Sequence, residues 1–140
     1  MPTALPTTIL SLGDDGNGVT VTASPHPVPG QAERLFDVRI EAAAHPFSGA
    51  VEQTFLEDDL SLLRQHLRAL TVPGEVVFGG DRAARLRLVV EKQEPGPGLV
   101  VEAELTPSGD DPLPLLRWLI FNQDAFVQRG VEAIDALLGA

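Results

Sequence analysis

The side chains that could take part in metal binding are few and widely spaced along this sequence. The histidines are His26, His45 and His66, and no two of them have the spacing of a metal-binding motif such as His-x-x-x-His. The acidic loop from Asp14 to Gly18 begins like a calcium loop, but its twelfth position is Pro25, where a bidentate glutamate is needed. We therefore expect no metal site.

Candidate nucleophiles are equally sparse. The sequence contains no cysteine, which excludes thiol chemistry and disulfide bonds. Ser48 lacks the glycine two residues before it that a nucleophile elbow requires. Neither a phosphate-binding loop nor the Gly-x-Gly-x-x-Gly motif of dinucleotide-binding folds occurs. We expect no catalytic residue and no cofactor, and hence a protein that is not an enzyme.

Glu57, Asp58 and Asp59 form an acidic cluster with two interpretations. Neighbouring carboxyl groups can act as a general acid and a general base. The cluster also precedes a Leu-rich segment, where carboxylates would accept the free N–H groups of a first helical turn and complement the helix dipole. We predict the second role, and we name the same three residues as the candidate surface for binding a protein partner.

The charge balance restricts the classes of partner. Twenty acidic residues against ten basic ones give a net charge of −10. Binding to nucleic acid or to anionic membranes relies on positive charge, so both are disfavoured. No apolar run approaches the roughly 18 residues of a membrane span, and the first residues lack the pattern of a secretory signal, which predicts a cytoplasmic protein. A basic protein partner suits this charge, although net charge also serves solubility alone.

The first half of the sequence predicts four strands and a helix. Strands are expected over residues 7–12 and 18–24, joined by a turn, and a proline-rich surface connection without regular structure over 24–30. Alternating apolar and polar residues predict two further strands that form a hairpin. This hairpin would bring Ile40 near Val51 and Arg39 near Glu52. The expected helix has a stripe of leucines at spacings of three and four, Leu60, Leu63, Leu67 and Leu70.

The second half repeats this order, beginning with a short strand over 75–78. Alternation predicts a hairpin that pairs Leu88 with Val101 and places two arginines opposite two glutamates on the wet face, Arg85 and Arg87 facing Glu102 and Glu104. Residues 113–121 are apolar without clean alternation, which predicts a strand covered on both faces. Trp118 within it is expected in the core.

A final helix is expected from about residue 123 to residue 138. Asn122 is its candidate N-cap. Gly130 lies in its interior, where glycine costs about 1 kcal/mol relative to alanine. We predict that close approach to a neighbouring strand compensates this cost.

These elements predict an α+β fold in the order ββββαββββα. About eight antiparallel strands form a curved sheet, or one split in two, with two helices packed on it. The chain of 140 residues is interpreted as a single domain, in which residues 1–30 form an N-terminal hairpin and a proline-rich connection.

Several segments together resemble a bacterial family. They are Pro46–Gly49, the acidic helix start at 55–60, Gly74–Val76, residues 121–126 and the Leu-rich tail at 133–138. Over residues 35–138 the sequence resembles the WapI-type immunity proteins and related short bacterial domains of unknown function. The resemblance implies a small acidic protein that binds and neutralises a cognate toxin domain. It carries over no catalytic residue, and its motifs are more specific for fold than for activity.

Two classes of function therefore follow. The first is non-enzymatic binding of a protein partner, with toxin neutralisation as its specific form; the sequence is also compatible with a homodimer. The second is a small-ligand-binding or enzymatic domain with a cleft between sheet and helices. A cleft lined by convergent polar groups would favour the second class, and an acidic face with exposed apolar anchors would favour the first.

Overall fold

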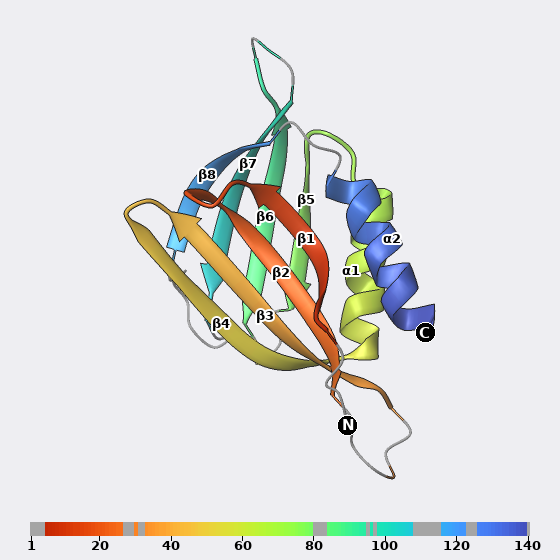
Figure 1. The fold of residues 1–140 in the computed structure, drawn as a ribbon. Coiled ribbons are helices and arrows are strands. Elements are labelled where there is room, and N and C mark those ends of the chain that lie inside the picture. Colours follow the sequence, from red (N-terminus) through yellow and green to blue (C-terminus); the bar gives the residue numbers. More distant parts are fainter. Residues whose placement is uncertain are drawn as a thin grey trace.

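Eight strands form two four-stranded antiparallel sheets, and two helices complete the predicted order ββββαββββα (Figure 1). This computed structural model describes residues 5–26, 30, 33–79, 84–94, 96, 98–107, 116–122 and 126–139. The N-terminal sheet consists of β1 (Thr7–Gly13), β2 (Asn17–His26), β3 (Leu35–Ala44) and β4 (Phe47–Leu56), in that spatial order. The C-terminal sheet consists of β5 (Gly74–Gly79), β6 (Arg85–Lys92), β7 (Leu99–Thr106) and β8 (Leu116–Asn122). The helices are α1 (Glu57–Ala69) and α2 (Phe126–Gly139).

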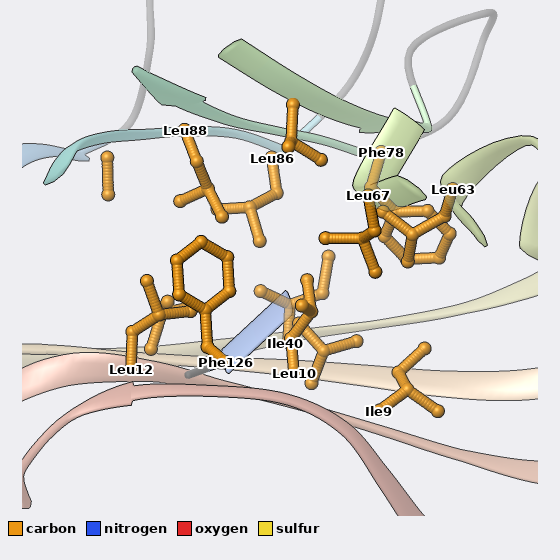
Figure 2. Packing of buried hydrophobic residues seen from close by; sticks show 14 of the residues in the cluster. Ile9, Leu10, Leu12, Ile40, Leu63, Leu67, Phe78, Leu86, Leu88 and Phe126 are labelled. Carbon is orange, nitrogen blue, oxygen red and sulfur yellow. The ribbon is translucent and has the colours of Figure 1, made fainter. Parts of the chain in front are cut away.

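The hydrophobic core fills the space between the two sheets. In Figure 2, Leu12 and Ile40 of the N-terminal sheet point toward Leu86 and Leu88 of the C-terminal sheet, and Phe126 of α2 lies between them. Each strand contributes alternate side chains to this core, because successive residues of a strand point to opposite faces. The expected alternation in β3 is confirmed, since Phe36, Val38, Ile40 and Ala42 are all buried.

The helices lie together at the side of the molecule where β1 and β5 form the edges of their sheets (Figure 1). The leucine stripe of α1 is buried at Leu60, Leu63 and Leu67, as its spacing predicted. In α2, a Cβ added to Gly130 would lie 2.9 Å from the Ile9 carbonyl oxygen. The predicted close approach of a strand at this glycine is therefore confirmed. Neither helix, over the residues described, is long and apolar enough to span a membrane.

The first turn of the chain also connects the two sheets. Asp14 accepts hydrogen bonds from the backbone N–H groups of Gly16 and Asn17, at 2.9 and 2.8 Å, which confirms the predicted turn. The side-chain amide of Asn17 then donates a hydrogen bond of 2.8 Å to the Leu119 carbonyl of β8. The tip of the β1–β2 hairpin is thereby anchored to the C-terminal sheet.

The expectation that residues 24–30 form no regular structure was wrong for their first part. β2 continues through Pro25 to His26. β1 pairs with β2 only as far as Ala23, so β2 has a partner strand on one side alone at the proline, and sheets tolerate proline at such edge positions. Residues 27–29 lie outside the described part of the chain.

The predicted hairpin of β6 and β7 forms with a register that differs by two residues. Leu88 pairs with Ala103 instead of Val101, and Arg85 lies opposite Thr106. Arg87 still faces a glutamate, but this is Glu104 instead of the Glu102 that the predicted register implies. A shift of two residues leaves every side chain on its original face, so hydrophobic alternation alone cannot distinguish the two registers.

The expectation that residues 113–121 are covered on both faces was wrong for β8, while 113–115 lie outside the described residues. Trp118 is buried as predicted, with 8% of its surface exposed, but Leu119 and Phe121 are 51% and 58% exposed. β8 is the last strand of the C-terminal sheet, and only its inner face meets the core. The predicted helix N-cap, Asn122, is the last residue of β8, and residues 123–125 are not described.

Candidate functional site on the outer face of the N-terminal sheet

The histidines are separated in the fold as they are in the sequence. His26 Nδ1 lies 2.9 Å from Asp37 Oδ2, and His66 Nδ1 lies 3.1 Å from the Val77 carbonyl oxygen. His45 stands in the turn between β3 and β4, where its backbone N–H donates to the Gly16 carbonyl. Among the described residues, no three potential metal ligands gather at one place.

The acidic cluster at the start of α1 is largely engaged within the protein. Glu57 binds Arg34, and the hydrogen bonds from that guanidinium hold the pKa of the Glu57 carboxyl below its ordinary value. Asp59 accepts a hydrogen bond of 2.9 Å from the backbone N–H of Leu56, which caps the helix. Asp58 is exposed. The predicted capping role is confirmed for Asp59, and the predicted partner-binding role of the three residues stays a prediction.

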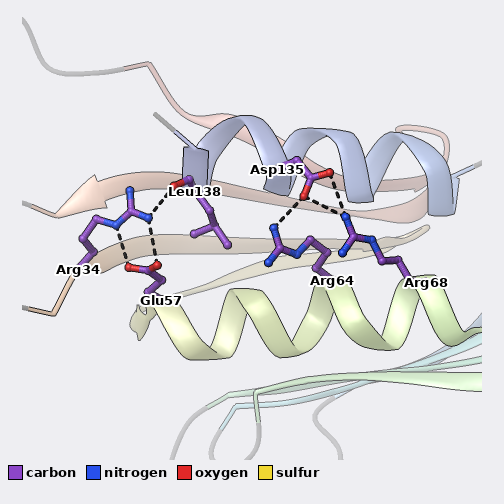
Figure 3. A network of polar contacts seen from close by, with 6 residues as sticks. All are labelled: Arg34, Glu57, Arg64, Arg68, Asp135 and Leu138. Carbon is purple, nitrogen blue, oxygen red and sulfur yellow. Dashed lines mark hydrogen bonds and ion pairs between the residues drawn. The ribbon is translucent and has the colours of Figure 1, made fainter.

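Two further ionic contacts hold α1 against α2 (Figure 3). Asp135 of α2 accepts hydrogen bonds from Arg64 and Arg68, one helical turn apart on α1. At the other end of the pair, Arg34 donates to the Leu138 carbonyl at 2.6 Å. Figure 3 shows that these side chains bridge separate elements of the fold, so we assign them a structural role.

The outer face of the N-terminal sheet, by contrast, is hollowed and lined by polar groups. Two depressions of ≈ 390 and ≈ 450 Å³ adjoin each other on it and share Arg39. Figure 1 shows the N-terminal sheet in front of the C-terminal sheet, and no described helix crosses its outer side. We call this surface the acidic face; its carboxylates are Asp14, Asp15, Asp37, Glu41 and Glu52, and its hydroxyls are Thr20, Thr22, Ser24, Ser48 and Thr54.

The composition of the acidic face follows from the strand period. In β2 and β3 the residues between the buried apolar positions are polar, and all of them therefore point to the same side of the sheet. The face thus gathers polar residues from β2, β3 and β4 and from the turn that precedes β2.

Arg39 lies at the centre of the acidic face between two carboxylates. It bonds Glu41 at 2.6 Å along its own strand and Glu52 at 2.5 Å on β4, which confirms the predicted proximity of Arg39 and Glu52. The hydrogen bonds to Glu41, and then those to Glu52, raise the pKa of Arg39 above its ordinary value. Five carboxylates against one guanidinium leave four surplus negative charges among the lining side chains.

Two hollows between helices and strands, among the described residues, are smaller than these depressions. One of ≈ 260 Å³ lies where α1 ends beside β5 and contains His66 and Glu75. Another of ≈ 210 Å³ lies between β1 and α2, where Ile9, Leu10 and Phe126 line it together with Arg129. These two hollows contain one carboxylate between them, that of Glu75, whereas the acidic face contains five.

Comparison with known proteins informs the fold alone. No family model matches the sequence, and no curated protein matches it. A solved structure of the plant transcriptional regulator PBF-2 is similar, with a TM-score of 0.51 and 15% sequence identity; the match covers 99% of this chain and 85% of that one. At this identity the similarity concerns the arrangement of strands and helices.

Sequence reasoning missed the acidic face as a site, although its signal was present. Thr20, Thr22 and Ser24 alternate with buried residues in β2, and Asp37, Arg39 and Glu41 do the same in β3. The alternation shows that the polar residues of each strand lie on its solvent-exposed face. It does not show that β2 and β3 are neighbours, so that their polar residues form one surface. That step needs the strand order, which the structure supplies.

Proposed function

We propose that this protein is a non-enzymatic binding protein whose acidic face docks a basic protein partner. The observation that carries the proposal is the hollowed, uncovered acidic face with its four surplus negative charges. Complementary charge raises the rate of association between proteins and selects against partners of the wrong sign. The resemblance to WapI-type immunity proteins suggests a cognate toxin domain as the partner, bound in the cytoplasm and thereby neutralised.

Nucleic acid is not the partner we propose, although the structurally similar PBF-2 is a transcriptional regulator. Affinity for nucleic acid comes mainly from Lys and Arg side chains that neutralise phosphates. The acidic face presents the opposite charge, and the whole chain carries a net charge of −10. Repulsion between like charges therefore favours a basic protein over a polyanion.

The proposal is tested with the product of the neighbouring gene, since immunity and toxin genes are expected side by side. Association rates are measured across ionic strength for the wild type and for the double variant Glu41→Gln/Glu52→Gln. Glutamine keeps an oxygen that can accept from Arg39 while removing two charges. We expect the double variant to associate more slowly at low salt and with a weaker salt dependence, because long-range attraction between charges is screened by ions.

Two controls separate this surface from net charge and from the acidic cluster of α1. Glu91→Gln/Glu94→Gln removes two exposed carboxylates away from the acidic face and should leave the rate almost unchanged. The triple variant Glu57→Gln/Asp58→Asn/Asp59→Asn tests the cluster predicted from the sequence. An equal slowing in both double variants would contradict the acidic face as the docking surface, and slowing only in the triple variant would move the interface to α1. Failure of the wild type to bind would contradict the proposed toxin partner.

A further inference from the structure

β4 is the last strand of the N-terminal sheet and has one unpaired edge. Among the described strands it pairs with β3 alone, continuously from Phe47 to Leu56. Near its C-terminal end β4 contacts residues of the C-terminal half of the chain: the Gln53 side chain accepts a hydrogen bond from the Ala84 N–H at 2.8 Å, and Phe55 packs on Phe78 of β5. Because these contacts lie near the C-terminal end of β4, the N-terminal half is the part of the unpaired edge that we consider open to another strand.

This half lacks the features by which proteins usually protect an edge strand. Phe47, Ser48, Gly49 and Ala50 are four consecutive exposed residues. They include no charged residue and no proline, and the register with β3 has no bulge. Native sheets normally place a charge, a proline or a bulge at such an edge, because free N–H and C=O groups otherwise pair with another strand.

The two sides of this edge differ in chemistry. Toward the inner side stand Phe47, which is 67% exposed, and the half-buried Val51. Toward the outer side stand Ser48 and Glu52, whose side chain is 70% exposed, next to the acidic face. A strand added here would meet apolar side chains on one side and negative charge on the other.

We propose that the partner binds by adding an extended strand to the N-terminal half of β4, and that this strand alternates apolar and basic residues. Its backbone would pair with residues 47–52, its apolar side chains would cover Phe47 and Val51, and its lysines or arginines would face Glu52 and the acidic face. In such β-strand addition, main-chain hydrogen bonds supply affinity and alternate side chains supply specificity. The inference rests on the proposed function, because it assigns the conformation of the basic partner at the same face.

The probe is a labelled peptide of alternating lysine and valine, six residues long, compared with a peptide of the same composition in which three lysines precede three valines. Binding is measured by fluorescence anisotropy at low salt. We expect the alternating peptide to bind about tenfold more tightly, since only its extended form places both residue types on the correct sides. Amide hydrogen exchange on the wild-type complex should show new protection at backbone N–H groups within residues 47–52.

Proline substitutions test the backbone contribution. Adjacent residues of a strand direct their N–H groups to opposite sides, so one of Gly49→Pro and Ala50→Pro removes a donor from the free edge and the other removes a donor facing β3. The edge-facing variant should keep its melting temperature and lose about tenfold in affinity for the alternating peptide. Ala50→Val, which keeps the N–H group, should bind like the wild type.

Failure of this inference is distinguishable from failure of the proposed function. If both peptides bind equally, without protection of residues 47–52, then the acidic face attracts basic chains by charge alone; strand addition is then wrong and the proposed function stands. If the neighbouring gene product binds and Glu41→Gln/Glu52→Gln slows it while the edge-facing proline does not, the same conclusion follows. If neither peptide nor the gene product binds, both proposals are wrong.

Discussion

Arg34 binds Glu57 through two parallel hydrogen bonds, from Nε to Oε2 at 2.8 Å and from Nη2 to Oε1 at 3.0 Å. The contact joins the residue before β3 to the first residue of α1. The same Nη2 also donates to the Leu138 carbonyl at 2.6 Å, so one guanidinium connects a strand and both helices (Figure 3). Paired geometry of this kind is among the more specific ways in which arginine binds a carboxylate.

This contact predicts a pH-dependent stability difference for Glu57→Gln. Arg34 lowers the pKa of Glu57 in the folded protein, so the stabilisation is fully present above the ordinary pKa of a glutamate, about 4.3, and is lost as the pH falls through the lowered folded value. The variant should therefore melt below the wild type at pH 7, and the gap should close in acid. Thermal unfolding from pH 7 to pH 2 measures this. Asp58→Asn, at the exposed neighbouring residue, is the control. A difference in melting temperature between Glu57→Gln and the wild type that widens in acid would contradict stabilisation by the Arg34–Glu57 contact.

Alanine substitutions should destabilise the protein much more at buried helix positions than at an exposed position of α1. Leu63 and Ile134 have 1% and 0% of their surfaces exposed, so Leu63→Ala and Ile134→Ala should each cost about 2–5 kcal/mol of unfolding free energy. Leu62→Ala removes the same atoms as Leu63→Ala from a side chain that is 49% exposed and should cost under about 1 kcal/mol. Denaturant unfolding of the three variants provides the test. Equal losses at Leu62 and Leu63 would mean that the helix face is misplaced.

Gly130→Ala should destabilise the protein, although alanine is the better helix former. The new methyl group would lie 2.9 Å from the Ile9 carbonyl oxygen and 3.0 Å from Leu67 Cδ1. Relieving such contacts requires β1 or α1 to shift, at a cost of about 1–3 kcal/mol. Gly139→Ala is the matched control on the same helix, because nothing lies within 4 Å of the added atom. A stabilised Gly130→Ala variant, measured by chemical denaturation, would contradict the close approach of β1.

Asn17 should stabilise the junction between the sheets through its 2.8 Å hydrogen bond to the Leu119 carbonyl. Asn17→Ala should cost about 0.5–1.5 kcal/mol, the usual net value of one hydrogen bond. Asn17→Asp should cost more, because a carboxylate places an acceptor against an acceptor. Denaturation of both variants gives the order, and faster amide exchange in the β1–β2 hairpin would locate the effect. Equal stability of the aspartate variant and the wild type would mean that the amide does not donate to β8.

The sequence by itself determined most of the elements and which of their faces are buried. Alternation in β3 and the leucine stripe of α1 are local patterns, because burial repeats every two residues in a strand and about every 3.6 in a helix. The turn at Asp14 and the cap at Asp59 were also predictable, since each depends on a side chain bonding a backbone group within three residues.

The tertiary structure alone decided what depends on distant partners. The pairing of Leu88 with Ala103 instead of Val101 leaves the alternation unchanged, so only the packing of whole sheets selects it. Leu119 and Phe121 are exposed because they lie on the side of β8 opposite the buried Trp118 and Ile120, and no local pattern shows that this side is left uncovered. The acidic face arises in the same way. Its carboxylates come from the first turn and from two strands, and they adjoin only because the strands pair side by side and twist together.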